Sequence, residues 1–197
     1  GGPSAFAMGQ TAENIHDQFP DLTKKMCDEY ALGSQRKAAA AIEQGKFRDM
    51  IIPVPAPQAD GSIKNIDQDQ HPRPETTLEG LSNLKTPFRE NGRVTAGNAS
   101  GLNDGAGAVV LMTREKAKSL GLQPRMRWIA SAVAAVDPKI MGTAPVPATQ
   151  KVLKKSGLEL KDMDFIEINE AFAVQVLHNL TRLGIDIQDE RVNPWGG

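Results

Sequence analysis

The spacing of apolar residues along the chain predicts two long amphipathic helices. The first begins at Thr23 and carries a continuous apolar stripe, and Gly45 stands where a C-terminal cap belongs. The second has Asn169 as its expected N-cap and an apolar stripe that starts at Phe172. Shorter helices are expected after threonine caps, the first of them at Thr11. Each stripe is a helical surface that must pack against a core.

Three segments between these helices predict strands. Residues 108–112 are a short apolar run, and residues 126–136 start with apolar residues that alternate with arginine and then become almost uniformly small and apolar, as in a strand that enters a buried sheet. Residues 164–168 are expected to form a third strand. The Asp-Gly pair at residues 60–61 is a hairpin signal inside a polar, proline-rich segment that reads as an irregular excursion over the surface. Strands that alternate with helices predict an α/β fold.

The most distinctive stretch is glycine-rich and reads VTAGNASGLNDGAGAVVL at residues 94–111. Its glycines can take a positive φ or leave space where a Cβ would collide with a neighbour. Ser100 and the Asn103-Asp104 pair can bond to nearby backbone groups or to a ligand. The pattern fits a binding loop held by a buried strand, and it fits a tight loop between two core strands equally well.

Composition and charge narrow the functional classes. The 197 residues, 40% of them hydrophobic, are enough to bury one core or two small ones. With 23 basic and 24 acidic residues there is no electrostatic footprint for nucleic acid, so no nucleic-acid partner is expected. No apolar run approaches the roughly 18 residues of a membrane span, and no span is expected. One cysteine fits a reducing compartment, and three scattered histidines predict no metal site.

Three side chains are candidates for chemistry. Asn169 follows the predicted strand at residues 164–168, where open α/β sheets place catalytic groups, but it also suits a helix cap with no further role. Arg73 lies between two prolines and is either a solvated arginine or a guanidinium presented to a phosphate or an aromatic ring. Cys27 lies on the first apolar stripe without a histidine partner, so we interpret it as a structural cysteine and not as a nucleophile.

Four blocks, in the same order and at similar separations, resemble the thiolase family. They read FAMGQTAEN at residues 6–14, VTAGNASGLNDG at 94–105, IMGTAPVP at 140–147 and NEAFA at 169–173. The resemblance covers practically the whole chain, and the combination is much more specific than any single block. It implies an α/β thiolase fold with layered αβαβα architecture, present in part, together with an irregular covering loop segment.

The resemblance also implies a domain organisation. Residues 1–87 correspond to part of the covering loop domain, residues 88–121 to the end of the N-terminal core domain, and residues 122–197 to the first half of the C-terminal core domain. The nucleophilic cysteine and the Gly-His-Pro histidine of the family match no residue of this chain. We therefore expect the chain to be incomplete and unable to finish the reaction as it stands.

Thiolases cleave a 3-ketoacyl-CoA with free CoA, or run the reverse Claisen condensation, through an acyl-cysteine intermediate. The resemblance implies that Asn169 is catalytic and orients a water in an oxyanion hole. It further implies that Ser100 binds the pantetheine arm of CoA and that Arg73 lies near its adenine end. Four apolar positions match the lining of the acyl and pantetheine tunnel: Met8, Phe88, Met141 and Phe172. Acyl-CoA and CoA are then substrates, and no bound cofactor is expected.

Assembly and compartment follow from the same resemblance. Family members pair through their core sheets, which predicts a homodimer or homotetramer, and the cytoplasm is the expected compartment, with a mitochondrial or peroxisomal matrix as the alternative. The RPETT segment at residues 73–77 leans toward degradative thiolases of fatty acid β-oxidation. Two other classes stay open. One is a non-catalytic acyl-CoA-binding or assembly fragment of a thiolase-like protein, and the other is a nucleotide-binding oxidoreductase, which the lack of Gly-x-Gly-x-x-Gly disfavours.

Overall fold

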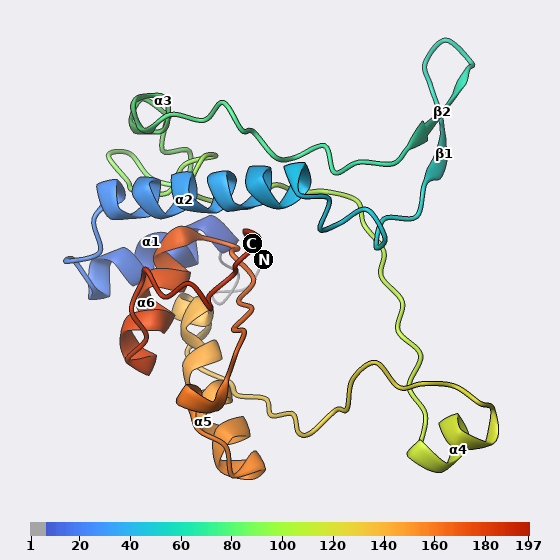
Figure 1. Ribbon diagram of the computed structural model, residues 1–197. Helices are drawn as coiled ribbons and strands as arrows, with labels where there is room; N and C mark the ends of the chain where they lie inside the picture. Colours follow the sequence, from blue (N-terminus) through green and yellow to red (C-terminus); the bar gives the residue numbers. More distant parts are fainter. Residues whose placement is uncertain (1–6) are drawn as a thin grey trace.

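Helix α2 (Lys24–Glu43) is the longest element of the computed structural model, which describes residues 7–197. Its N-cap is Thr23, whose hydroxyl accepts a hydrogen bond from the Met26 amide, as the sequence predicts. Beyond the helix Gly45 has a φ of 70°, which confirms the predicted end of the helix. Figure 1 shows α2 lying across the helices of the body of the molecule. Phe6, in the first thiolase-like block, lies outside the described residues.

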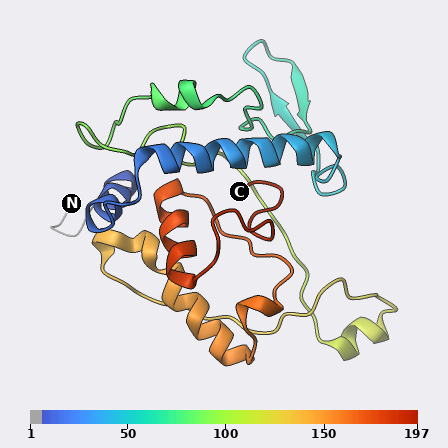
Figure 2. The same ribbon diagram turned by 60° about the vertical axis from the view of Figure 1, so that its left-hand side comes forward.

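Helices α1 (Met8–Gln18) and α6 (Ala173–Leu183) lie below α2, and the 3-10 helix η1 (Pro138–Thr143) packs against both. Figure 2 shows this arrangement from the side. The prediction that Thr11 caps α1 is wrong, because the helix already begins at Met8. The Thr11 side chain lies inside the first turn of the helix, where its hydroxyl donates a hydrogen bond to the Met8 carbonyl at 2.7 Å.

Helix α5 (Pro145–Ser156) follows η1 directly and ends at Gly157, which has a φ of 72°. A short 3-10 helix, η2 (Leu160–Asp162), then leads back toward α6. None of the helices in residues 7–197 is both long and apolar enough to cross a membrane.

The core consists of two adjoining clusters between α1, α2 and α6. The first contains the buried residues Ala12, Ile15, Leu22, Cys27, Val94, Ala173, Val174 and Leu177. The second contains Val176, Leu180, Ile185 and Val192. Tyr30 of α2 packs against both clusters, so α2 contacts the two of them.

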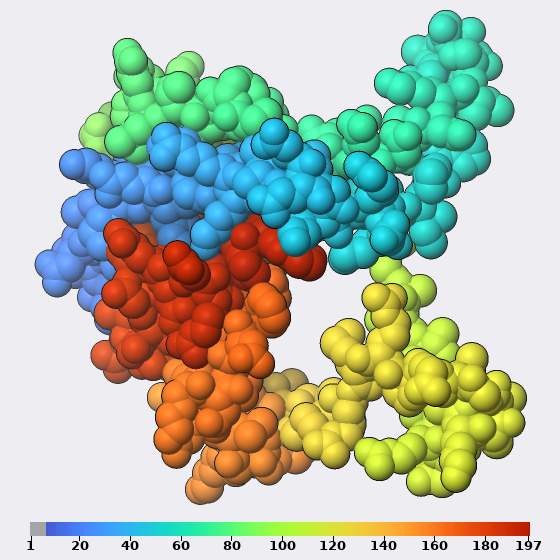
Figure 3. Space-filling model, viewed as in Figure 1, coloured from blue at the N-terminus to red at the C-terminus, as the bar shows by residue number. Residues whose placement is uncertain are grey.

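Two parts of the chain stand away from this body. Strands β1 (Val54–Pro57) and β2 (Ile63–Ile66) form an antiparallel hairpin, and Gly61 in its turn has a φ of 82°, which confirms the hairpin predicted at residues 60–61. Helix α3 (Leu78–Ser82) packs on α2, whereas helix α4 (Arg114–Ser119) lies at the end of a long excursion. Figure 3 shows the hairpin and α4 separated from the main body.

Two of the predicted strands are extended but are not part of a sheet. Within residues 108–112 Val110 is 84% exposed, and within residues 126–136 Val133 is 86% exposed. The prediction that these runs are buried strands is therefore wrong for this chain, because no strand of residues 7–197 pairs with them through backbone hydrogen bonds. The third predicted strand retains one parallel bridge, which joins Ile166 to Val192.

Candidate functional site

The glycine-rich loop enters the body at a buried polar anchor on α1. Glu13 is 1% exposed, and its carboxylate accepts hydrogen bonds from the backbone amides of Arg93 and Val94, each at 2.8 Å. A buried carboxylate is tolerated only when donors of this kind satisfy it. Helix α1 therefore fixes the point where the loop begins.

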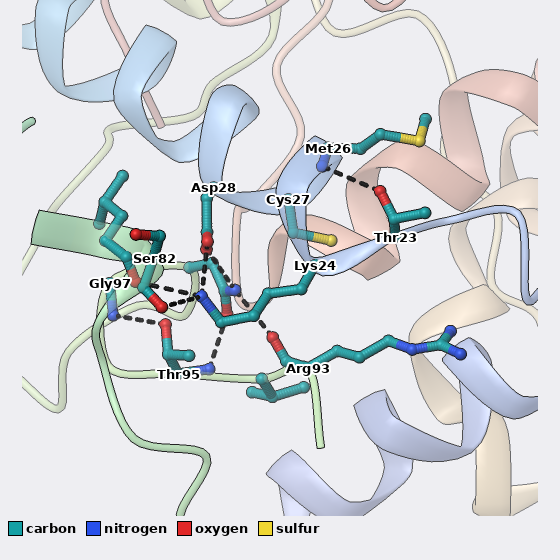
Figure 4. A network of polar contacts seen from close by, with 12 residues as sticks. Thr23, Lys24, Met26, Cys27, Asp28, Ser82, Arg93, Thr95 and Gly97 are labelled. Atoms are coloured by element: carbon teal, nitrogen blue, oxygen red, sulfur yellow. Dashed lines mark hydrogen bonds and ion pairs between the residues drawn. The ribbon is translucent and has the colours of Figure 1, made fainter. Parts of the chain in front are cut away.

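A second polar network ties the loop to α2 (Figure 4). The buried Asp28 carboxylate accepts a hydrogen bond from Lys24 Nζ at 2.6 Å and another from Asn98 Nδ2 at 2.9 Å. Lys24 also donates to the Leu81 carbonyl at 3.1 Å, which brings α3 into the network. The Asn98 side-chain oxygen accepts from the Thr95 amide at 2.8 Å. Asp28 thus holds Asn98 in place through a charge-assisted contact.

The anchored loop pairs with the NEAFA segment. The Asn98 carbonyl accepts a hydrogen bond from the Ala173 amide at 2.9 Å, and the Ser100 amide donates to the Ala171 carbonyl at 3.0 Å. The backbone of Ser100 therefore lies beside the segment that follows Asn169, although the two residues are far apart in the sequence.

This pairing overturns the prediction that Asn169 is the N-cap of α6. The helix begins at Ala173 with Phe172 at the N-cap position, and the Asn98 carbonyl serves the first helical amide. Asn169 is exposed, and among residues 7–197 its side chain has no hydrogen-bond partner. Within this described part of the chain, its amide is free for a water or a ligand.

Asn169 lies on the wall of a cavity of about 440 Å³ between α1, η1, α5 and α6. Three more of the predicted site residues line the same cavity: Met8, Met141 and Phe172. Most of the remaining wall is aliphatic. An apolar cavity with a few polar groups is typical of a small-molecule site, and it suits an acyl group held beside one amide.

The position of Met141 in this wall depends on two asparagines that hold η1. Asn14 Nδ2 on α1 donates to the Lys139 carbonyl at 2.9 Å, and Asn179 Nδ2 on α6 donates to the Gly142 carbonyl at 3.1 Å. Asn179 is fully buried. Both backbone contacts lie close to Met141, so α1 and α6 together place it at the cavity.

The other three predicted site residues lie outside this cavity. Phe88 is 39% exposed, and its ring covers Gly9 on α1. Ser100 is exposed and reaches the site only through its backbone. Arg73 is exposed as well, and its backbone amide donates to the Gln35 side chain at 2.8 Å. Four of the seven predicted site residues therefore line one cavity, and the other three do not line it.

Cys27 is confirmed as a structural cysteine. It is 1% exposed, and burial, reinforced by the charge of Asp28, raises the pKa of its thiol to about 12. The Nε2 atom of His16 lies 4.0 Å from its sulfur, but burial lowers the pKa of His16, which makes this imidazole a poor base. Cys27 therefore stays a protonated thiol near neutral pH.

The sequence pattern does not reveal the buried or half-buried polar residues that hold the site together: Glu13, Asp28, Tyr30, Glu170 and Asn193. One signal was available in the α2 stripe, where Asp28 directly follows the buried Cys27. A charged residue at the edge of an apolar stripe must find a polar partner when the stripe is buried. Lys24, one of its two partners, lies one turn earlier on the same helix, but the other, Asn98, is too distant in the sequence for the pattern to reveal it.

Comparison with known sequences identifies the family. The family described as "Thiolase, N-terminal domain" matches residues 4–115, and "Thiolase, C-terminal domain" matches residues 122–197. The chain is 47% identical over 191 residues to the 3-oxoadipyl-CoA/3-oxo-5,6-dehydrosuberyl-CoA thiolase of Escherichia coli (strain K12), covering 97% of this chain and 47% of that protein. It is 50% identical over 192 residues to an acetyl-CoA acetyltransferase of Pseudomonas aeruginosa, covering 98% and 48%. The chain therefore spans about half the length of these relatives.

Solved structures give the same answer for the fold. The chain superposes on the Bacillus anthracis acetyl-CoA acetyltransferase with a TM-score of 0.94 and 46% identity, covering 100% of this chain and 49% of that one. It superposes on human mitochondrial 3-ketoacyl-CoA thiolase in complex with CoA with a TM-score of 0.89 and 42% identity, covering 98% and 47%. The predicted α/β thiolase fold is thus confirmed, in part of its extent. The chain belongs to the thiolase family.

Proposed function

We propose that the protein carrying this chain is a thiolase-type acyltransferase, which cleaves a 3-ketoacyl-CoA with CoA or runs the reverse condensation. One observation carries the proposal: Asn169, whose amide has no partner among residues 7–197, stands on the wall of an apolar cavity that Met8, Met141 and Phe172 also line. Relatives that bear the names acetyl-CoA acetyltransferase and 3-ketoacyl-CoA thiolase support this chemistry. They favour a catalytic role over a non-catalytic acyl-CoA-binding fragment.

The proposed reaction uses a cysteine outside this chain, since Cys27 is buried and protonated. Its thiolate attacks the ketone carbon of the 3-ketoacyl-CoA, and an electron pair moves onto the carbonyl oxygen. Collapse of this intermediate breaks the carbon–carbon bond, which leaves an acyl-cysteine and an acetyl-CoA enolate that takes up a proton. The thiol of free CoA then loses its proton, accepts the acyl group and restores the cysteine thiolate.

Asn169 acts in this scheme where negative charge develops on oxygen. Its N–H orients a water toward that oxygen, so a neutral, fixed dipole stabilises the transition state. The methionines and Phe172 hold the acyl group away from bulk water. Ser100, Phe88 and Arg73 lie outside the cavity, where the pantetheine arm and the adenine end of CoA would run.

Two further features of the whole protein are proposals of the same kind. We propose domain limits at residues 1–87, 88–121 and 122–197, and the gap between the two family matches, residues 116–121, supports the last boundary. We also propose a homodimer or homotetramer. Light scattering on the purified full-length protein measures the oligomeric state directly.

Replacing Asn169 tests the proposed function in the full-length protein. Asn169→Ala is expected to lower kcat by roughly 10²- to 10³-fold, the usual cost of losing one oxyanion-hole donor. The melting temperature should hardly change, because this side chain has no hydrogen-bond partner among residues 7–197. Asn65→Ala is the matched control, because Asn65 is also an exposed asparagine but lies on β2, away from the cavity. This variant should retain wild-type turnover. An unchanged rate for Asn169→Ala would remove this residue from the mechanism and contradict the proposal.

The proposed CoA contact is tested separately. Ser100→Ala is expected to raise KM for CoA while kcat stays close to wild type, because the hydroxyl binds the arm of the substrate and not the reacting carbonyl. A CoA titration at saturating acyl substrate measures both constants. A fall in kcat at unchanged KM would place Ser100 in the chemical step instead.

A further inference from the structure

The residue before Asn169 is fixed by the side chain of Asn193. The Asn193 amide donates to the Ile166 carbonyl at 3.0 Å, which continues the parallel bridge at Ile166 and Val192. The Asn193 side chain then makes the hydrogen bonds that the backbone of a neighbouring strand would make to Ile168. Its Oδ1 accepts from the Ile168 amide and its Nδ2 donates to the Ile168 carbonyl, both at 2.8 Å. Asn193 is 1% exposed and has a φ of 41°, a conformation that asparagine adopts more readily than most residues.

The residue after Asn169 is fixed by two donors on one oxygen. Glu170 Oε1 accepts the Tyr30 hydroxyl at 2.8 Å and Asn193 Nδ2 at 2.7 Å. Burial, followed by the charge of Glu170, raises the pKa of the Tyr30 phenol above its ordinary value, so the hydroxyl remains a donor. The cluster is closely packed, because a Cβ at Gly197 would stand 2.7 Å from the carboxyl carbon of Glu170.

The chain is therefore held on both sides of Asn169. Ile168 and Glu170 are held by Asn193 and Tyr30, and the Ala171 carbonyl accepts the Ser100 amide at 3.0 Å. Tyr30 comes from α2, the same rigid helix that fixes Asn98 through Asp28. A site supported by packed elements in this way keeps its geometry within a fraction of an ångström.

We propose that Tyr30, Glu170 and Asn193 form a positioning cluster that sets the orientation of the Asn169 amide toward the reacting oxygen. The inference rests on the proposed function, because it needs Asn169 to act on the substrate. None of the three lines the cavity, so they act through the backbone of Ile168 and Glu170 and not by touching the substrate. The rate is sensitive to such an arrangement, since a misplacement of about 1 Å can cost on the order of 10²-fold.

Tyr30→Phe in the full-length protein is the primary test. It removes one hydroxyl and keeps the ring that packs against both core clusters. Loss of one of the two donors to Glu170 should shift Asn169 by less than 1 Å, so kcat is expected to fall about tenfold, with KM for CoA and the melting temperature nearly unchanged. Thr181→Ala is the matched control. It also removes one hydrogen-bonded hydroxyl, which donates to the Leu177 carbonyl at 2.8 Å, but this hydroxyl lies on α6 and is not part of the cluster. This variant should retain wild-type turnover.

A double-mutant cycle separates positioning from a general structural role. In the Asn169→Ala background, Tyr30→Phe is expected to cause no further loss of kcat, because the side chain that it positions is gone. A purely structural effect would lower kcat by the same factor in both backgrounds.

Glu170→Gln and Glu170→Leu supply a second pair, which keeps the inference testable if Tyr30→Phe does not fold. The glutamine keeps an oxygen acceptor for both donors and should retain at least tenfold more turnover than the leucine.

The outcomes distinguish this inference from the proposed function. If Asn169→Ala leaves the rate unchanged, the proposed function fails and the positioning cluster fails with it. If Asn169→Ala is slow but Tyr30→Phe keeps the wild-type kcat, or loses the same factor in both backgrounds, only the positioning cluster is overturned. Equal turnover for Glu170→Gln and Glu170→Leu would overturn it as well.

Discussion

Replacing Asp28 by asparagine probes the network that anchors the glycine-rich loop. The Asp28 carboxylate has one oxygen 2.6 Å from Lys24 Nζ and the other 2.9 Å from Asn98 Nδ2. An amide has only one oxygen, so in either orientation its NH₂ group must face a donor, either Lys24 or Asn98. The variant therefore loses one hydrogen bond to a charged group and leaves a buried donor unsatisfied.

The expected cost of Asp28→Asn follows from this geometry. A hydrogen bond to a charged group contributes about 1.5–3 kcal/mol, and the side chains of Asp28 and Lys24 are only 2% and 24% exposed, so water can replace the lost partner only in part. We expect the free energy of unfolding to fall by about 2–3 kcal/mol. At 1.4 kcal/mol for each factor of ten, local opening of the loop should become roughly 30- to 140-fold more frequent.

Hydrogen exchange is the assay that localises this effect. The amide of Thr95 donates to Asn98 and the amide of Ser100 donates to Ala171, so both should exchange faster when Asn98 is released. Thermal melts of the same samples report the global cost.

The control for Asp28→Asn lies on the same helix at the same spacing. Lys25 and Glu29 form an ion pair at 3.7 Å with side chains 77% and 50% exposed, and Glu29→Gln should cost no more than about 0.5 kcal/mol. If Asp28→Asn costs no more than Glu29→Gln, and exchange of the loop is unchanged, the reasoning about the network is refuted.

Two further predictions concern buried titratable groups. Burial lowers the pKa of His16 and His178 below 6.5, so unfolded histidines bind protons as pH falls through 6.5 while the folded ones do not. The melting temperature should therefore fall between pH 7 and pH 5, and His16→Asn should flatten this dependence; a rise on acidification would contradict it. Because burial raises the pKa of Cys27 to about 12, iodoacetamide at pH 8 should label its peptide only after unfolding, and rapid labelling of the native protein would show that the thiol is accessible.

The candidate site could be predicted from the sequence only where the residue type carries the chemistry. Asn169, Met8, Met141 and Phe172 were identified through the thiolase resemblance, and the structure places them on one cavity. The groups that hold them were not identified. The Tyr30 and Glu170 side chains meet at 2.8 Å across 140 positions of sequence, a separation at which no local pattern gives a signal.

What the sequence alone determined is local. A threonine hydroxyl at Thr23 can satisfy an amide at the start of a helix, and a glycine at residue 61 can take a positive φ, so the start of α2 and the β1–β2 hairpin turn follow from residues next to each other in the chain.

The tertiary structure decided which distant groups satisfy one another. Asn169 has the right residue type for a helix cap, but the Asn98 carbonyl reaches the first helical amide instead, and this leaves the Asn169 side chain free at the cavity. The run at residues 108–112 has the composition of a buried strand, but an extended chain becomes a strand of a sheet only beside another chain segment, and none lies there in residues 7–197. Hydrogen-bond partners and burial depend on folded neighbours, and their identity is not contained in the local pattern of residues.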